Sequence, residues 1–283
     1  MSGPDLPKRI FGYDVVERLG EGALSSIYVV SDPKTNQLRA LKHVVPTEEK
    51  HGRFITQLET EFNVSRTFRH PGLRKCLDLK VRKKLLFGPV AEAALVMELV
   101  DGTPLERAVP ETVPEIVDVF VRVANAMAAV HHYNYLHCDT KPSNILRTTE
   151  NIGADDSVKL IDFGQACQVG TSKERVQGTP DFIAPEQVRC KPLGFYTDVY
   201  NLGATLYWAL TRRRVPTLLT VAKDQRDVVR EQAFPKPHEL NPAVPGGLSE
   251  LVMDCVRHQA GFRPQSMAEV LSRLVPFGTG KVK

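Results

Sequence analysis

The stretch Tyr135-Leu-His-Cys-Asp-Thr-Lys-Pro-Ser-Asn-Ile-Leu146 places an Asp, a Lys and an Asn between two apolar patches. Asp139 precedes Asn144 by five positions, and Lys141 lies between them. Cys138 comes directly before the Asp. Carboxylate and amide oxygens are ligands that Mg²⁺ accepts, and a positioned carboxylate can also take a proton from a hydroxyl group. The stretch therefore indicates a polar reaction site around Asp139, and it gives the Cys no obvious role.

Composition and charge narrow the class of protein. Of the 283 residues, 42% are hydrophobic and 25% are charged, which is typical of a globular protein. The formal net charge of +4 is too small to favour nucleic acid as a partner. The five Cys contain no C-x-x-C pair, which favours reduced thiols in the cytoplasm over a disulfide framework. The N-terminus does not resemble a signal peptide, and the longest apolar stretches are too short to span a membrane.

The first part of the chain has the pattern of a small sheet with one helix. Residues 11–45 alternate in the manner of paired strands, with turn residues at 32–36. Apolar side chains recur every four residues over 48–69, which predicts a helix. Two more strands fit residues 73–81 and 93–100.

After a break at residues 101–104 the chain becomes mostly helical. Four segments with apolar side chains at helical spacing predict helices: 113–132, 198–210, 248–258 and 267–274. Between them, residues 137–186 fit short strands and loops. The pattern therefore predicts a sheet part and a larger helical part, with a boundary near residue 101.

Two features of the sheet part could handle phosphate groups. Gly20 and Gly22 lie between two strands, where backbone amides can cradle a phosphate, although a plain hairpin turn also explains them. Lys42 lies on a predicted strand, and Glu61 lies nineteen residues later on the predicted helix. A pair between these two side chains could hold the Lys ammonium toward the phosphates of a nucleotide.

A second acidic motif follows in the helical part. A short apolar strand ends in Asp162-Phe163-Gly164, and Asp162 with Asn144 would supply two oxygen ligands for Mg²⁺. Three further motifs would each be read alone as a loop, a helix start or a turn: residues 178–186, 197–203 and 261–264.

In this order, the motifs resemble the eukaryotic-type (Hanks-type) Ser/Thr protein kinase family from about Phe11 to Leu274. The positions that match at the family's spacing are Gly20, Gly22, Lys42, Glu61, His137, Asp139, Lys141, Asn144, Asp162, Phe163, Gly164, Ala184, Pro185, Glu186, Asp198 and Arg263. The resemblance implies a bilobal α+β fold in a single kinase domain. An antiparallel-sheet N-lobe with one main helix would cover about 8–100, a hinge about 98–102, and a mainly helical C-lobe about 103–275.

The resemblance also implies a reaction, the transfer of the γ-phosphoryl group of ATP to a hydroxyl group with the help of Mg²⁺. Asp139 would orient the hydroxyl and take its proton, and Lys141 would steady the γ-phosphate. Asn144 and Asp162 would bind Mg²⁺.

The nucleotide site follows from the same resemblance. Lys42, paired with Glu61, would hold the α- and β-phosphates of ATP. The remaining expected contacts come from the glycine loop, the apolar adenine pocket and the hinge, at Gly20, Glu21, Gly22, Ile27, Ala40, Met97, Glu98, Val100 and Leu146.

Other matches have a structural interpretation. Glu186 and Arg263 would form a buried ion pair, whose loss would leave an uncompensated charge. Asp198 would tie a helix start to the backbone of the catalytic loop. His137 and Phe163 would belong to an apolar column, so we expect a satisfied core histidine and no proton transfer at His137.

The substrate class follows from two positions. Lys141, two residues after Asp139, is the form usual in Ser/Thr kinases, and Gly178-Thr179 before Ala184-Pro-Glu186 also resembles that type. We therefore expect Ser or Thr residues of proteins as substrates.

The sequence departs from the family pattern at the activation segment, residues 162–186. Cys138 replaces the Arg that usually precedes the catalytic Asp, and Cys167 stands where a second basic residue is common. A neutral thiol cannot pair with a phosphate group as Arg does. We therefore expect activity that does not depend on phosphorylation of Thr171 or Ser172.

Two more substitutions bear on regulation. Ser65 replaces an apolar residue one helical turn after Glu61, which would leave the helix to be set by a regulatory protein partner. Ser25 replaces the third glycine of the loop and would stiffen it. Cys138 and Cys167 could approach closely enough for a disulfide, but two separate half-buried thiols are the simpler interpretation, because a sequence gives no distance.

Two alternatives remain open. A pseudokinase, which binds ATP and acts as a scaffold or allosteric partner, is favoured by the altered segment, Ser65 and Ser25. It is disfavoured because the Lys, both Asp residues and the Asn of the reaction are all present. A small-molecule kinase of related fold usually lacks the Ala184-Pro-Glu186 segment.

Overall fold

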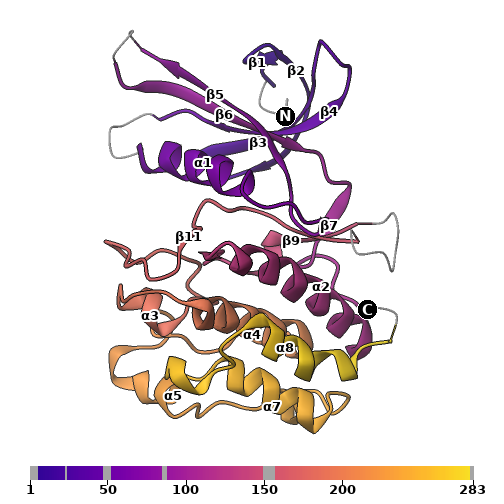
Figure 1. The fold of residues 1–283 in the computed structure, drawn as a ribbon, viewed down its shortest axis with the longest axis vertical. Coiled ribbons are helices and arrows are strands. Elements are labelled where there is room, and N and C mark those ends of the chain that lie inside the picture. The colour runs from indigo at the N-terminus through magenta and orange to yellow at the C-terminus, as the bar shows by residue number, and fades with distance from the viewer. Residues whose placement is uncertain (1–5, 23, 47–51, 85–87, 149–156, 281–283) are drawn as a thin grey trace, which may run out of the picture. The chain divides into compact units, whose positions relative to one another are not determined.

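The computed structural model describes residues 6–22, 24–46, 52–84, 88–148 and 157–280. The chain divides into two compact units, shown in Figure 1. The first unit comprises residues 1–67 and 74–100, and the second comprises residues 68–73 and 101–283.

The first unit is built on a six-stranded antiparallel sheet. Its spatial order is β1-β2-β3-β4-β6-β5. The strands are β1 (Arg9–Ile10), β2 (Tyr13–Glu21), β3 (Ser25–Ser31), β4 (Leu38–Val44), β5 (Cys76–Lys83) and β6 (Val90–Glu98). The strands predicted within residues 11–45 are thus confirmed. The two predicted at 73–81 and 93–100 exist, but β5 begins three residues later and β6 three residues earlier than predicted, and their ends differ by two residues. Asp32 closes the predicted turn after β3, because its backbone oxygen accepts the Asn36 amide at 2.7 Å and its carboxylate accepts the Lys34 amide at 2.9 Å.

One helix, α1 (Gly52–Ser65), covers one face of this sheet (Figure 1). Its buried Ile55 and Leu58 pack with Leu95 and Met97 of β6 in one apolar cluster. The predicted helix over 48–69 is wrong at its C-terminal end, and its residues 48–51 lie outside the described part of the chain. The helix ends at Ser65, and the predicted residues 68 and 69 belong instead to the second unit, where Phe68 is buried.

Four helices of eight residues or more lie in the described part of the second unit. They are α2 (Val113–His132), α4 (Phe195–Thr211), α7 (Gly246–Cys255) and α8 (Met267–Leu274). The predicted bounds of the first and last are confirmed at both ends. The other two helices begin two to three residues earlier than predicted, and α7 also ends three residues earlier. Thr112 and Glu115 form a capping box that fixes the start of α2. The short helices α3 (Pro185–Val188), α5 (Arg226–Arg230) and α6 (Pro237–Leu240) lack a counterpart in the predicted pattern.

Short strands surround residues 137–144, as the sequence predicts for residues 137–186. One small sheet has the order β10-β9-β7, from β7 (Gly102–Pro104), β9 (Ile145–Thr148) and β10 (Val158–Leu160). A second sheet pairs β8 (Tyr135–Leu136) with β11 (Cys167–Gln168). These two sheets hold residues 137–144 and 161–166 as loops of one region.

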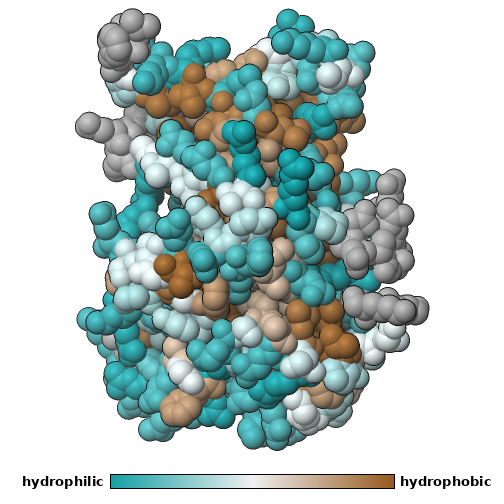
Figure 2. All heavy atoms as spheres, viewed as in Figure 1, coloured by the Kyte–Doolittle hydropathy of each residue, from teal (hydrophilic) through white to brown (hydrophobic). Residues whose placement is uncertain are grey.

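On the face drawn in Figure 2, hydrophilic side chains cover most of the second unit, and hydrophobic side chains gather over the first. Leu77 and Val81 of β5 are among the exposed apolar residues. Within the described residues, α2 and the other helices are too short or too polar to cross a membrane.

Candidate active site

In the first unit, the predicted pair of Lys42 and Glu61 is confirmed. The ammonium of Lys42 on β4 lies 3.0 Å from Oε2 of Glu61 on α1. Arg74, which the sequence analysis missed, donates to Oε1 of the same carboxylate at 3.1 Å. Glu61 is only 1% exposed, and the two cations offset the free-energy cost of burying its carboxylate charge. Arg74 therefore helps to hold α1 and the Lys42 ammonium in one arrangement.

The glycine loop forms a tight hairpin between β2 and β3. Gly20 pairs with Ile27 and Glu21 pairs with Ser26, and the amide of Gly22 donates to the Ser25 carbonyl at 2.6 Å. A Cβ atom at Gly22 would lie 3.0 Å from Oγ of Ser25, which is closer than ordinary contacts. A side chain at position 22 would therefore press on the hydroxyl of Ser25, the residue that replaces the third glycine.

Two predicted adenine-pocket residues, Ala40 and Met97, face each other in the sheet. They are register partners on β4 and β6, and both are buried in the cluster under α1. Glu98 follows on β6, and its amide donates to the Lys75 carbonyl at 3.0 Å. Val100 ends the first unit, whereas Leu146 lies on β9 of the second.

In the second unit, Asp139 is held by hydrogen bonds to both oxygens of its carboxylate. Lys141 donates to Oδ2 of Asp139 at 2.8 Å. The amide and the hydroxyl of Thr179 donate to Oδ1 at 3.0 Å and 2.8 Å. The Thr179 hydroxyl also accepts from the Lys141 ammonium at 2.8 Å. Thr179, which the sequence analysis used only to infer the substrate class, is therefore part of the site.

Asn144 and Asp162 are brought together by the backbone. The Ile161 amide donates to the Asn144 carbonyl at 2.9 Å, so Asp162 directly follows a residue bound to Asn144. The side-chain amide nitrogen of Asn144 donates to the Asp139 carbonyl at 2.9 Å. This bond fixes the orientation of the amide, so its oxygen is the atom that could bind a metal ion. Asp162 has a φ of 69°, an unusual backbone conformation for a residue with a side chain.

This donor set fits Mg²⁺ better than a metal that needs an all-protein cage. Among the described residues, His, Cys, Asp and Glu side chains form no cluster of three that could hold a metal ion. Mg²⁺ is commonly bound through one or two carboxylates, with water and substrate phosphates completing its shell. One carboxylate and one amide oxygen meet that requirement.

The backbone before Asp139 is fixed by Asp198, as the sequence predicts. Its carboxylate accepts from the amides of His137 at 2.9 Å and Cys138 at 2.8 Å, and from the His131 ring at 2.8 Å. Burial alone would raise the pKa of Asp198, but the His131 hydrogen bond and the Cys138 amide lower that pKa below its usual range. Asp198 thus supports Cys138 in its left-handed conformation, with a φ of 65°.

His137 has the structural role expected of it. Its Nε2 lies 3.1 Å from the Ile161 carbonyl, and its Nδ1 accepts the Asp139 amide at 3.3 Å. The ring packs edge-on against Phe163, with centroids 5.0 Å apart, and Phe68 lies on the same Phe163 ring at 5.7 Å. Both ring nitrogens are therefore engaged in holding the loop.

Gln187 connects the end of the activation segment to the catalytic loop. Its side chain donates to the Cys138 carbonyl at 2.8 Å and accepts from the Ala184 amide and the Asn201 side chain, both at 3.0 Å. The sequence analysis assigned no role to Gln187, since one glutamine carries no local signal.

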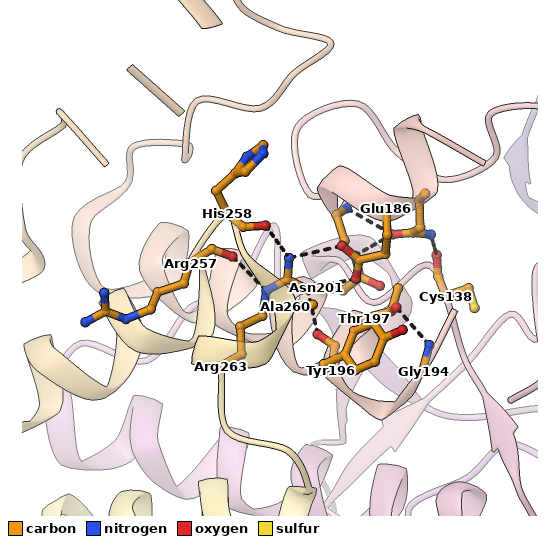
Figure 3. A network of polar contacts seen from close by, with 12 residues as sticks. Cys138, Glu186, Gly194, Tyr196, Thr197, Asn201, Arg257, His258, Ala260 and Arg263 are labelled. Carbon is orange, nitrogen blue, oxygen red and sulfur yellow. Dashed lines mark hydrogen bonds and ion pairs between the residues drawn. The ribbon is translucent and has the colours of Figure 1, made fainter. Parts of the chain in front are cut away.

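The predicted ion pair of Glu186 and Arg263 is confirmed beside it. The two guanidinium nitrogens lie 2.7 Å and 3.0 Å from the two carboxylate oxygens, and Figure 3 shows this network. Arg263 also donates to the carbonyls of Tyr196, Arg257 and His258. These bonds anchor α3 and the start of α4, which support the catalytic loop through Gln187 and Asp198.

Comparisons with known proteins agree with this geometry. The model of the protein kinase domain matches residues 13–273. A probable serine/threonine-protein kinase of Clostridium perfringens is 27% identical over 274 residues, which cover 93% of this chain and 38% of that protein. Serine/threonine-protein kinase PknB of Mycobacterium tuberculosis is 27% identical over 279 residues, 95% of this chain and 43% of PknB. The smooth-muscle myosin light chain kinase of Gallus gallus is 29% identical over 202 residues, 69% of this chain and 10% of that protein. The chain thus spans about two fifths of the length of its bacterial relatives.

Proposed function

Because the chain belongs to the protein kinase domain family, we propose that it transfers the γ-phosphoryl group of ATP to Ser or Thr hydroxyl groups of proteins. The hydrogen-bonded set around Asp139 is the observation that carries this proposal. Phosphoryl transfer depends mostly on positioning and charge stabilisation, and a carboxylate with a fixed orientation supplies the first. The bacterial relatives are named as serine/threonine kinases, which supports the substrate class.

In this proposal Asp139 binds the substrate hydroxyl and takes its proton. Thr179 holds one carboxylate oxygen and Lys141 holds the other, so the carboxylate cannot rotate away from the hydroxyl. A positioned base of this kind contributes about 10²- to 10⁴-fold to a rate.

The phosphate groups would be bound by cations and backbone amides of this chain. Lys42, oriented by Glu61, would contact the α- and β-phosphates, and Lys141 would contact the γ-phosphate. Asn144 and Asp162 would hold Mg²⁺, which when bound neutralises charge that develops on the phosphates. The remaining nucleotide contacts that we propose are those of the glycine loop, adenine pocket and hinge: Gly20, Glu21, Gly22, Ile27, Ala40, Met97, Glu98, Val100 and Leu146.

We also propose that this activity does not need a phosphorylated activation segment. Leu193 holds the segment through its backbone, since its amide donates to Thr171 at 3.0 Å and its carbonyl accepts from Gly170 at 2.8 Å. Gln187 and Thr179 tie the later part of the segment to the catalytic loop. These bonds supply the order that an Arg–phosphate contact would otherwise supply.

Incubation with radiolabelled ATP, Mg²⁺ and casein tests the transfer activity. We expect the wild-type chain to label Ser or Thr, and we expect Asp139→Asn to lower the rate by about 10²-fold or more. Asp224→Asn, the same change at an exposed position, serves as the matched control and should keep the wild-type rate. Equal rates for wild type and Asp139→Asn would contradict the proposal, and ATP binding without any transfer would favour a pseudokinase.

A further inference from the structure

Two thiols meet where the catalytic loop passes the activation segment. Sγ of Cys138 lies 3.6 Å from Sγ of Cys167. Sequence alone favoured two separate thiols, because it gave no distance between them. The observed proximity follows from the β8–β11 ladder, in which Cys167 is the register partner of Leu136, two residues before Cys138.

The backbone on both sides of this thiol pair is fixed. The Cys138 amide donates to Asp198 at 2.8 Å, and its carbonyl accepts from Gln187 at 2.8 Å. The Val169 amide donates to the Asn134 carbonyl at 2.9 Å, which extends the ladder just beyond Cys167. A disulfide needs about 2.05 Å between its sulfur atoms, so the sulfurs must approach by roughly 1.5 Å. Rotation of the two side chains toward each other is the natural route, because the backbone of both residues is already held.

The two thiols differ in exposure and in acidity. Cys138 is buried, whereas Cys167 is half-buried. The hydrogen bond from the Cys138 thiol lowers the pKa of Cys167, against the effect of burial, and the Lys173 ammonium and a hydrogen bond with Thr171 lower it further. The same hydrogen bond, burial and the charge of Asp198 raise the pKa of Cys138. Cys167, which is the more exposed thiol and has the lowered pKa, is therefore expected to react first, and the buried Cys138 second.

We propose that Cys138 and Cys167 form an oxidation site that reacts with a hydroperoxide and closes to an intramolecular disulfide between the catalytic loop and the activation segment. The Cys167 thiolate attacks the terminal peroxide oxygen, the O–O bond breaks, and the leaving alkoxide takes a proton to become an alcohol. The Cys138 sulfur then attacks the Cys167 sulfenic acid, the S–O bond breaks, and hydroxide leaves as water with the proton of Cys138. The two thiols lose two electrons and two protons, and the peroxide is reduced to alcohol and water.

This bond would occupy the place of the missing Arg–phosphate contact. Cys138 stands where the basic residue of that contact is usual, and Cys167 stands at the second basic position. The disulfide would link the same two segments covalently, without a phosphate group. Its meaning for regulation rests on the proposed kinase function, whereas its formation does not.

Disulfide mapping after exposure to tert-butyl hydroperoxide tests the proposal. Trypsin can cut after Arg122, Arg147, Lys159 and Lys173, which places Cys138 and Cys167 on separate peptides, 123–147 and 160–173. We expect these peptides to be joined after oxidation and separated again by dithiothreitol. Cys190→Ser, a change at another half-buried thiol, should leave the crosslink intact.

Two variants separate the roles of the thiols. Cys167→Ser should abolish the crosslink, and Cys138→Ser should leave Cys167 as a sulfenic acid that dimedone traps, with further oxidation to the sulfinic acid. Circular dichroism checks the fold of both variants, and if Cys138→Ser fails to fold, the wild-type map and Cys167→Ser still decide. A wild-type protein in which Cys167 is oxidised without joining Cys138, or in which neither thiol reacts before Cys190, would overturn the proposal. Because mapping requires no phosphotransfer, its outcome is independent of the kinase assay.

Discussion

At the scale of single residues, the site depends on side chains that hold other side chains. Thr179 orients Asp139, Asp198 fixes the backbone before it, and Gln187 binds the Cys138 carbonyl. Each of these positioning groups is engaged by hydrogen bonds of 2.8 Å, and none is proposed to contact the transferred phosphoryl group. Their loss should therefore affect the rate of transfer more than the binding of ATP.

Thr179→Val tests this expectation at one hydroxyl group. The change keeps the shape of the side chain but removes the bond to Oδ1 of Asp139 and the acceptor for Lys141. We expect kcat to fall by about 10- to 100-fold with little change in KM for ATP, because Oδ1 of Asp139 keeps only the Thr179 amide and the carboxylate is held less firmly. Steady-state kinetics measure both constants, and Thr179→Ser should restore most of kcat. A rise in KM for ATP without a fall in kcat would argue against the positioning role. A Thr179→Ser variant with kcat as low as that of Thr179→Val would argue against it too.

The acidity of Cys167 gives a second test at this scale. A lowered pKa means that the thiolate is present at lower pH than for an ordinary thiol, whose pKa is about 8.5. Because iodoacetamide reacts with the thiolate, alkylation of Cys167 in the folded protein should reach half its maximal rate at a lower pH than alkylation of the same residue in the unfolded chain. In Cys138→Ala the profile should shift to higher pH, since the hydrogen bond to the thiolate is lost. Site-resolved mass spectrometry measures the rate, and an unshifted profile in this variant would contradict the assigned cause.

At the scale of elements, α1 is fixed to its sheet by more than apolar packing. Glu61 on the helix binds Lys42 on β4 and Arg74 just before β5. Ser65 donates to the Phe62 carbonyl at 3.2 Å, so its hydroxyl is satisfied within the helix. The second cation compensates the buried carboxylate and reduces the freedom of the helix to move away from Lys42.

Arg74→Met tests the contribution of this second cation. We expect the free energy of unfolding to fall by about 1–3 kcal/mol, because a buried carboxylate loses one of its two charged donors. We also expect KM for ATP to rise, since the position of Lys42 is less well defined. Arg230→Met removes an exposed pair with Asp227 and should change stability by no more than about 0.5 kcal/mol. Chemical denaturation measures both variants, and equal effects would mean that the bond between Arg74 and Glu61 is not structural.

At the scale of the whole molecule, the long elements and the ordered motifs were predictable from the sequence. The helices α2 and α8 match their predicted bounds because each has a strong apolar period and a capping residue at its start, Thr112 and Ser266. The short helices α3, α5 and α6 have four or five residues, too few for a period to be recognised. The end of α1 was missed because the apolar period runs on into residues 68–73, which pack in the second unit.

The site residues that belong to a recognisable sequence motif could be predicted. Those that act through a contact with a residue far away in the chain could not. Arg74, Thr179 and Gln187 bind partners 13, 40 and 49 positions away in the chain. A local pattern carries no information on such contacts, because register and packing decide them. The distance between Cys138 and Cys167 was hidden for the same reason.

The central claim is that the catalytic set of this chain is assembled without a phosphate on its activation segment. The most direct measurement is the rate of phosphoryl transfer by the variant Thr171→Ala/Ser172→Ala, compared with wild-type protein treated with a phosphatase. Backbone bonds of Gly170 and Thr171 to Leu193 hold this part of the segment, and both substitutions leave these bonds in place. We expect the variant to keep kcat within about 2-fold of the treated wild type, a change below about 0.4 kcal/mol in activation free energy. A fall of 100-fold or more, in a variant that remains folded, would contradict the account.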